Sequence, residues 1–304
     1  MIRYQFTKNN MSKVHIVFGV YSRISYFKRC LNSIKDQITY HDVSLVIDGP
    51  KDSPGVIENI NLFKHSFKDK YENIDDRIFV SEKKIGAEHN IIRSFKIGFE
   101  TSDCDYVIFI EDDIEFNNLY LEQMELLWNF VKDYDEISTF SCYSRDCLYY
   151  SDELLEQYKN CLLTQYHQYG TGIKRKYYND TLKSLMNEYL ENTEEDMIND
   201  SFKNIEKVIN TKYGIYPQPE KTHWDIYYCM VSYSLGYYRV STCLNYCKHI
   251  GIDGLDCNSD LYKIMFKDLE NEKYHSKNLI YNFIFDRNLN KYNQMIQTNN
   301  NKKD

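Results

Sequence analysis

Short apolar, β-branched runs alternate with amphipathic helical patterns four times in the first 130 residues, and this alternation limits the fold more than any other feature. The runs predict strands at 14–20, 43–47, 77–80 and 105–110. The patterns predict four helices. The first spans 26–38 with Ser25 as its cap, the second passes through Val56, Ile60 and Phe63, and the others span 88–99 and 119–131. Strands that alternate with helices form βαβ units, so we expect an α/β fold whose mostly parallel sheet is flanked by helices on both faces.

Beyond residue 131 the pattern is less regular. We expect a solvated acidic helix or an insertion at 188–200, a linker at 217–219, a helix at 223–238 and a polar tail from about residue 290. We interpret residues 1–130 as a ligand-binding half, 131–265 as a second functional half, and 266–304 as a C-terminal helix and tail.

Composition excludes several classes of function. The chain has 304 residues, of which 42% are hydrophobic, so it can build a core. Its 37 basic and 45 acidic residues give a net charge of −8, so we expect no nucleic acid partner. Nine cysteines without a CxxC pair predict reduced thiols, and thus a cytoplasmic protein. The first ten residues lack the apolar region of a secretory signal, and no apolar run of about 18 residues predicts a transmembrane segment. Peripheral contact with the inner face of a membrane stays open.

Polar residues follow three of the expected strands. Arg23 follows the first strand, Asp48 the second, and Glu111, Asp112 and Asp113 end the fourth. Open parallel sheets bind ligands at the carboxyl ends of their strands. Three adjacent carboxylates after a buried strand repel one another, and a hard divalent cation such as Mg²⁺ or Mn²⁺ removes that repulsion while leaving positions for diphosphate oxygens. The alternative is a solvated acidic turn, but the position directly after the strand favours the metal site.

Several segments resemble, in the same order, GT-A glycosyltransferases of the N-acetylglucosaminyltransferase I family and its bacterial relatives, in which EDD replaces the usual DxD. The resemblance covers about residues 14–254 and rests on VFGVYSRISYFKRCLNSI, LVIDGP, KKIGAEHNIIRSFKIGF, YVIFIEDDIEF, YGTGIKRKYY, THWDIYY and KHIGIDG. It departs at Thr171 and Ile173, where bacterial relatives usually carry Trp, and residues 180–216 match nothing. The resemblance implies the GT-A, Rossmann-like fold with an irregular, acceptor-binding second half.

The resemblance implies nucleotide-binding roles for three residues. Arg23 would support the phosphates or the base, Asp48 would read the uracil edge, and His89 would face the uridine. Each has a plainer alternative: a surface residue near a helix start for Arg23, a turn residue before Gly-Pro for Asp48, and a buried structural histidine for His89.

The acidic triplet and the Gly-rich segment would hold the donor sugar and the metal. Glu111 and Asp112 would contact the ribose and the donor sugar, and Asp113 would be the direct ligand of Mn²⁺ or Mg²⁺. Gly170 and Gly172 would lie in a loop against the donor sugar.

Residues near the end of the resemblance would carry the chemistry. Asp225 would be the catalytic base, with Trp224 beside it shielding the site from water. The alternative is an acidic residue at a helix N-terminus, with Trp224 in the core. His249 would assist the metal or the diphosphate, and Gly251 would let its loop approach the phosphates, although a structural loop is as good an interpretation.

The resemblance thus implies an inverting, metal-dependent glycosyltransferase. It would move a sugar, with N-acetylglucosamine as the first candidate, from a UDP-sugar to a hydroxyl of a glycan, glycolipid or glycoprotein acceptor. Two alternatives stay open: a retaining glycosyltransferase or nucleotidyltransferase on the same fold, and a catalytically silent module that binds carbohydrate or nucleotide. The complete acidic triplet together with Asp225 argues against the silent module.

Overall fold

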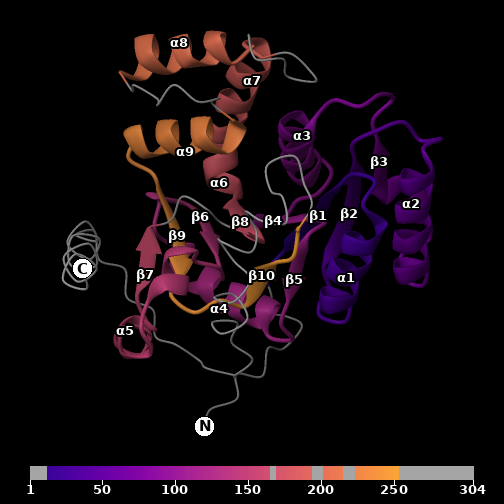
Figure 1. The fold of residues 1–304 in the computed structure, drawn as a ribbon, viewed down its shortest axis with the longest axis horizontal. Coiled ribbons are helices and arrows are strands. Elements are labelled where there is room, and N and C mark those ends of the chain that lie inside the picture. Colours follow the sequence, from indigo (N-terminus) through magenta and orange to yellow (C-terminus); the bar gives the residue numbers. More distant parts are fainter. Residues whose placement is uncertain (1–11, 165–168, 194–200, 215–222, 253–304) are drawn as a thin grey trace.

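The computed structural model describes residues 12–164, 169–193, 201–214 and 223–252 (Figure 1). Its strands are β1 Val14–Val20, β2 Asp42–Ile47, β3 Ile78–Val80, β4 Tyr106–Glu111, β5 Ile114–Phe116, β6 Ile137–Ser141, β7 Leu162–Thr164, β8 Thr171–Lys174, β9 Tyr238–Thr242 and β10 Cys247–His249. Its α-helices are α1 Ile24–Ile34, α2 Pro54–Phe67, α3 Ala87–Glu100, α4 Tyr120–Val131, α5 Asp152–Tyr158, α6 Arg175–Tyr177, α7 Lys183–Glu191, α8 Ser201–Tyr213 and α9 Trp224–Ser234. Short 3₁₀ turns span Ile74–Arg77 and Asp146–Tyr149, and a π-turn spans Tyr178–Leu182.

Eight of the strands form one mixed sheet in the order β3-β2-β1-β4-β8-β6-β9-β7, and β10 pairs with β5 in a separate two-stranded ribbon. The first four strands in this order are parallel, as expected from the alternation of the sequence. Val20 lies beside Ile47, and Gly19 lies beside Glu111, so β1, β2 and β4 end at the same edge. The predicted α/β fold with a mostly parallel sheet flanked by helices is confirmed.

The second half extends the same sheet rather than forming one of its own. β8 is antiparallel to both β4 and β6, β9 is parallel to β6, and β7 is antiparallel to β9. The expected Gly-rich loop is therefore wrong over Thr171–Lys174, which forms a buried central strand. A Cβ on Gly172 would lie 2.5 Å from the Phe140 ring, so glycine lets that ring lie across the strand. The expected helix at 223–238 ends at Ser234, and the chain enters β9 at Tyr238.

Helices cover both faces of the sheet and enclose two apolar cores. Residues of α1, α2 and α4 fill one core, and residues of α3, α7, α8 and α9 fill the other. Along β1 the side chains alternate between the two, with Phe18 in the first core and Val17 in the second. Phe18 meets Phe27 of α1 edge-to-face with ring centroids 5.8 Å apart. Both faces of this strand are thus buried, as its continuous apolar run predicts.

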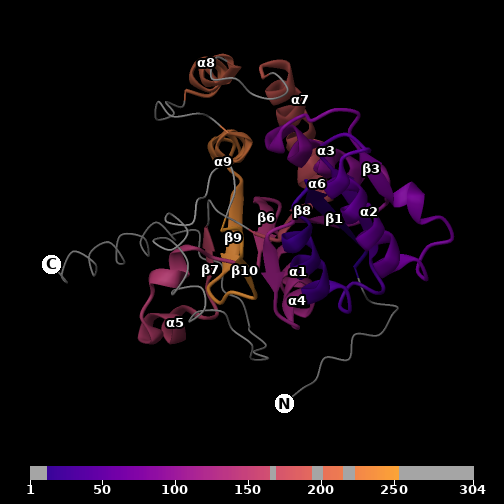
Figure 2. The ribbon, with the colours of Figure 1, turned by 45° about the vertical axis from the view of Figure 1, so that its right-hand side comes forward.

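The helices α7, α8 and α9 pack together at one end of the molecule (Figures 1 and 2). The Glu188 carboxylate of α7 accepts hydrogen bonds from the Tyr213 hydroxyl of α8, at 2.8 Å, and from the Tyr227 hydroxyl of α9. We expected a solvated acidic segment from residue 188. This expectation is wrong for Glu188, whose carboxylate joins three helices through hydrogen bonds. Residues 194–200, the expected linker at 217–219 and the expected C-terminal helix and tail at 266–304 lie outside the described residues.

None of the helices in the described ranges combines the length and the apolar character that crossing a bilayer requires.

Candidate active site

The acidic triplet lies at the carboxyl end of β4, where the chain reverses into β5. The side chains of Asp112 and Asp113 are buried, since the residues are only 3% and 8% exposed. The alternative of a solvated acidic turn is therefore wrong for these two residues. Burying carboxylates is unfavourable unless positive charge or hydrogen-bond donors surround them, so their partners identify what the site is built to hold.

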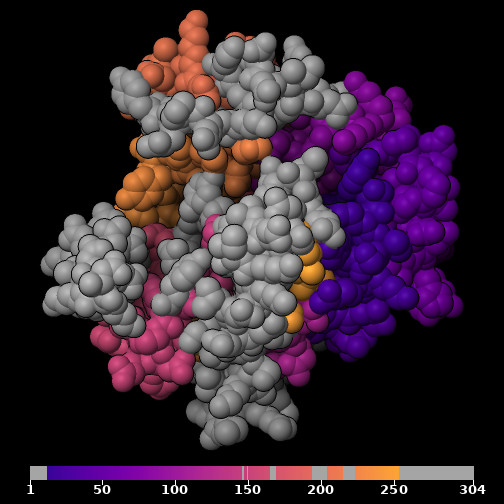
Figure 3. Space-filling model, in the orientation of Figure 1, coloured from indigo at the N-terminus to yellow at the C-terminus, as the bar shows by residue number. Residues whose placement is uncertain are grey.

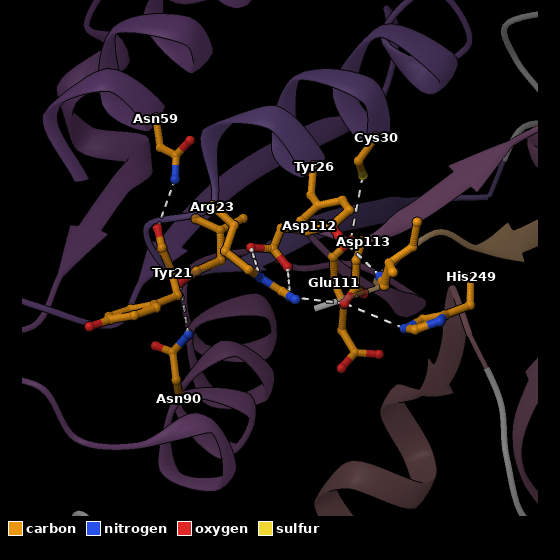
Figure 4. A network of polar contacts seen from close by, with 12 residues as sticks. Tyr21, Arg23, Tyr26, Cys30, Asn59, Asn90, Glu111, Asp112, Asp113 and His249 are labelled. Atoms are coloured by element: carbon orange, nitrogen blue, oxygen red, sulfur yellow. Dashed lines mark hydrogen bonds and ion pairs between the residues drawn. The ribbon is translucent and has the colours of Figure 1, made fainter. Parts of the chain in front are cut away.

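Arg23 is the first of these partners (Figure 4). It is the N-cap residue of α1, directly after β1, and its guanidinium donates to both carboxyl oxygens of Asp112 and, from Nη2 at 2.9 Å, to Oδ2 of Asp113. The backbone N–H of Tyr21 also donates to Asp112. Although burial alone disfavours its charge, the two carboxylates raise the pKa of Arg23. Arg23 does lie at a helix start with its side chain 32% exposed, but its guanidinium is bound by the acidic turn, and Asp112 ties the loop after β1 to that turn.

His249 approaches Asp113 from the opposite side (Figure 4). The antiparallel pairing of β10 with β5 sets His249 beside Ile114, and Nε2 of His249 lies 3.4 Å from Oδ2 of Asp113. The ring of Tyr169 stacks on the imidazole with ring centroids 5.2 Å apart. The site thus joins the first half of the chain to its last described residues.

The loop after β10 passes directly over the acidic turn. The N–H of Ile250 donates to the backbone carbonyl of Asp113 at 2.7 Å, and a Cβ on Gly251 would lie 2.5 Å from Oδ2 of Asp113. The N–H of Ile252 reaches the Tyr26 hydroxyl of α1 at 3.0 Å. In the space-filling view these last described residues, in yellow-orange, lie against the indigo surface of the first half (Figure 3). Glycine at position 251 therefore allows this close approach.

The electrostatics of the site show an excess of negative charge. Burial, together with Asp113 and Asp112, raises the pKa of Glu111 to about 8. Burial and the Asp113 charge raise the pKa of Asp112 to about 6 despite its bonds to Arg23. Burial alone would raise the pKa of Asp113 too, but the hydrogen bond from His249 and the Arg23 charge lower it. Asp113 is therefore the carboxylate of the triplet whose ionised form the site favours most, and it lies between the Arg23 guanidinium and the His249 imidazole.

Asp225 lies close enough to act on this cluster electrostatically. It is the second residue of α9 and is half-buried, and its charge contributes to the raised pKa of Glu111. Its Oδ1 accepts a hydrogen bond from the N–H of Ile226 at 2.8 Å. Trp224, by contrast, is 1% exposed and stacks on Tyr228 with ring centroids 5.3 Å apart. Trp224 forms part of the core beneath Asp225, and a contact with the donor stays a prediction.

Asp48 and His89 lie near the start of α3. Both oxygens of Asp48 accept backbone hydrogen bonds, from Ile85 N–H at 2.7 Å and from Gly86 N–H at 3.1 Å. His89 is buried in the first turn of α3, close in sequence to that loop. Asp48 thus fixes the start of α3. The uracil and uridine contacts of Asp48 and His89 stay predictions.

Gly170 and Gly172 are both buried. Gly170 has φ of 56°, and a Cβ there would lie 2.4 Å from the Tyr120 hydroxyl, which donates to the Gly170 carbonyl. These contacts give both glycines a packing role, and a contact of either with the donor sugar stays a prediction. The side chain that the segment brings to the site is that of Tyr169, on His249.

Sequence reasoning missed Tyr169, Glu88 and His223. Glu88 of α3 accepts hydrogen bonds from the Trp224 N–H at 2.8 Å and contacts Nδ1 of His223 at 3.0 Å. These residues lie in no common motif, and only the packing of α3 against α9 brings them together. The one local signal was an acidic residue in the first turn of α3, which is typical of helices in general.

Asp113 and His249 are the residues of this site that could hold a divalent cation. Within the described ranges, no group of three or more His, Cys, Asp or Glu side chains is arranged to hold a metal ion. Asp113 and His249 nevertheless offer an ionised carboxylate and an imidazole nitrogen 3.4 Å apart, beside unmatched negative charge. Carboxylate oxygen and imidazole nitrogen are ligands that Mn²⁺ accepts, and carboxylate oxygen also suits Mg²⁺. The pair therefore fits a cation whose other ligands come from a diphosphate and water.

Comparisons with known proteins add only distant likenesses. No family model matches the chain, and no curated protein matches it. Similar solved structures include the mannosyltransferase PcManGT from Pyrobaculum calidifontis in complex with GDP-Man and Mn²⁺, at 11% identity and a TM-score of 0.37, covering 56% of this chain and 46% of that chain. They also include TarS 1–349 of S. aureus, at 14% identity and a TM-score of 0.41, covering 83% and 63%, and its complex with UDP, at 18% and 0.30, covering 42% and 34%.

This chain spans less than two thirds of the length of each of these structures. At TM-scores this low, the likenesses decide neither the fold nor the activity of the chain. Both rest on its own geometry.

Proposed function

We propose that the chain is an inverting, metal-dependent glycosyltransferase that moves a sugar from a UDP-sugar to a hydroxyl of a glycan, glycolipid or glycoprotein acceptor in the cytoplasm. N-acetylglucosamine is the first candidate for the sugar. One observation carries the proposal: Arg23, Asp113 and His249 meet at the carboxyl edge of the sheet. Asp225 lies near them, since its charge contributes to the raised pKa of the adjacent Glu111. This edge is where open α/β sheets bind nucleotides.

Arg23 and the acidic turn would bind the diphosphate end of the donor. Asp113 and His249 would hold Mn²⁺ or Mg²⁺, which, when bound, supplies electrostatic stabilisation of the departing diphosphate. The Arg23 guanidinium is held by the carboxylates of Asp112 and Asp113, so its positive charge is in place before the donor arrives. Asp48 and His89, near the start of α3, would contact the uridine.

Asp225 would act on the acceptor. A sugar hydroxyl is a weak nucleophile until a base removes its proton in the transition state, and a positioned carboxylate does so. The hydroxyl oxygen would attack the anomeric carbon, the bond to the diphosphate oxygen would break, and the hydroxyl proton would pass to the Asp225 carboxylate. A single displacement inverts the anomeric configuration, by the logic that also separates inverting from retaining glycosidases.

The test is turnover of UDP-sugars, by transfer to acceptors or by hydrolysis, with Mn²⁺ or with a chelator. We expect UDP release that requires the metal and a product of inverted configuration by NMR. Equal turnover with chelator would overturn the metal dependence, and retained configuration would favour the retaining alternative. A screen of donors by thermal shift precedes this assay, because a true donor stabilises the folded chain by mass action.

A further inference from the structure

A glutamate of one helix binds the first turn of another. Glu88 is in the first turn of α3, and its Oε2 accepts the N–H of Trp224, the first residue of α9, at 2.8 Å. Its Oε1 lies 3.0 Å from Nδ1 of His223, the residue before α9. A carboxylate only accepts hydrogen bonds, so Nδ1 of His223 carries the proton of this contact. The Glu88 side chain is 19% exposed, so these contacts are partly shielded from water.

Glu88 replaces a local cap. Helices usually bind their first free N–H groups with the side chain of the N-cap residue. The N-cap residue of α9 is His223, whose side chain makes no capping hydrogen bond. The Trp224 N–H is bound by Glu88 from α3 instead, and Asp225 is the next residue along. The position of the first turn of α9 is therefore set by α3.

The start of α3 is itself fixed from the opposite direction. Asp48, at the carboxyl end of β2, binds the N–H groups of Ile85 and Gly86 just before that helix. Two carboxylates thus bind the start of α3 to its neighbours: Asp48 joins it to the end of β2, and Glu88 joins it to the first turn of α9. Aromatic contacts close the same interface, since Phe95 of α3 lies 6.5 Å from Trp224 between ring centroids.

We propose that Glu88 is the positioning residue of the reaction: it holds the first turn of α9 so that the Asp225 carboxylate faces the acidic end of β4. This inference rests on the proposed function, in which Asp225 is the base. Glu88 contacts neither the acidic turn nor the expected metal ligands in any hydrogen bond described for it, so it acts through Trp224 and His223. A displacement of about 1 Å in a reacting group lowers rates by about 10²-fold, so a tether of this kind acts on the chemical step.

The test compares Glu88→Ala, Glu88→Gln and the control Glu122→Ala. Glu122 is an exposed glutamate in the first turn of α4, so its removal repeats the chemical change at a matched helical position. For Glu88→Ala we expect kcat to fall by about 10²-fold, while the KM for the donor and the Kd for UDP with Mn²⁺ stay within about twofold. Glutamine keeps a carbonyl oxygen for the Trp224 N–H, so Glu88→Gln is expected to restore most of the lost kcat.

Equal loss of UDP affinity and of kcat in Glu88→Ala, or an unchanged kcat, would overturn the inference. A second readout needs no activity: amide hydrogen exchange over Trp224–Ser234 should accelerate in Glu88→Ala and stay at the wild-type rate in Glu122→Ala. Unchanged exchange refutes the tether even in an active enzyme. A wild-type chain that turns over no nucleotide sugar refutes the proposed function instead, so the two failures are distinguishable.

Discussion

Oδ2 of Asp113 lies 3.4 Å from Nε2 of His249, and the two residues meet because β10 pairs with β5 outside the main sheet. The same oxygen of Asp113 accepts a hydrogen bond from Arg23 at 2.9 Å. A carboxylate shared by a guanidinium and an imidazole is held in one orientation. This orientation is what a cation and a diphosphate would use, and it gives the site its sharpest tests.

Asp113→Asn should abolish the metal-dependent part of UDP binding. Asparagine keeps the shape of the side chain but removes the negative charge of the Asp113 carboxylate, whose ionised form this site favours. We expect the Mn²⁺-induced gain in UDP affinity, measured by calorimetry, to fall about tenfold or more, since hydrogen bonds to a charged group contribute about 1.5–3 kcal/mol. The control is Asp103→Asn, whose exposed carboxylate pairs with Lys13 at 3.2 Å. A variant that still responds to Mn²⁺ as the wild type does would remove Asp113 as a metal ligand.

Asp225→Asn should separate chemistry from binding. Loss of a general base lowers the rate by about 10²–10⁴-fold. Oδ1 of Asp225 accepts a hydrogen bond from the N–H of Ile226 at 2.8 Å, and the amide oxygen of asparagine can accept the same bond. We therefore expect kcat to fall in this range while the Kd for UDP stays within about twofold of the wild type. Parallel loss of UDP binding and thermal stability would assign Asp225 a structural role.

Gly251→Ala should disturb the site with little effect on the rest of the fold. A methyl group at this position would lie 2.5 Å from Oδ2 of Asp113 and 3.0 Å from Cε1 of His249, so the loop or the carboxylate must move. Overpacking of this kind destabilises by about 1–3 kcal/mol. We expect weaker UDP binding with Mn²⁺ and a lower melting temperature. The neighbouring exposed Ile252→Ala should change neither. Unchanged UDP binding and melting temperature in Gly251→Ala would show that the loop is only loosely packed on Asp113.

Acid should destabilise the chain through a buried histidine. His15 of β1 is fully buried, and its Nδ1–H donates to the Gly98 carbonyl at 2.8 Å while its Nε2 accepts from the Ser44 hydroxyl at 2.8 Å. Burial lowers the pKa of His15 from 6.5 to about 4. Between these values the unfolded chain binds a proton that the folded chain does not, so stability is retained above pH 6.5 and lost as the pH falls towards 4.

The loss attributable to His15 amounts to about 3 kcal/mol at most over this window. Urea unfolding at several pH values measures it as the slope of the free energy of unfolding against pH. We expect His15→Gln to flatten that slope, whatever its effect on stability at neutral pH. The exposed His65→Gln should leave the slope as it is in the wild type. An equal slope in His15→Gln and the wild type would contradict the assignment.

The sequence was most informative where long elements carry one pattern. The seven-residue run of β1 and the six-residue run of β4 are mostly apolar, with His15 and Glu111 as their ionisable residues, and both are central strands of the sheet. The predicted N-cap of α1 was wrong. Serine is a favoured capping residue, so Ser25 was expected to cap the helix, but the helix begins at Ile24 with Arg23 as its N-cap. The acidic turn holds Arg23, and this long-range contact outweighs the local preference of serine.

Short strands and distant partners were beyond what the sequence could predict. β8 has four residues, too few to show a period, and it ends at Lys174, whose buried ammonium binds the carbonyls of Val131 at 3.1 Å and Tyr134 at 2.7 Å. The acidic turn and Arg23 were predictable because each follows its own strand directly. Glu88 was not, because its partners belong to α9 and only tertiary packing brings the two helices together.

The separation of the β5–β10 ribbon from the eight-stranded sheet has an energetic consequence. Three residue pairs join the two ribbon strands, with the hydrogen bond from the Ile250 N–H to the Asp113 carbonyl and the Tyr169 ring on His249 beside them, so the ribbon can open while the eight-stranded sheet stays paired. Such sub-global opening has a lower free energy than unfolding of the whole domain. Opening of the ribbon would separate His249 from Asp113 and leave the pairing of the eight-stranded sheet undisturbed.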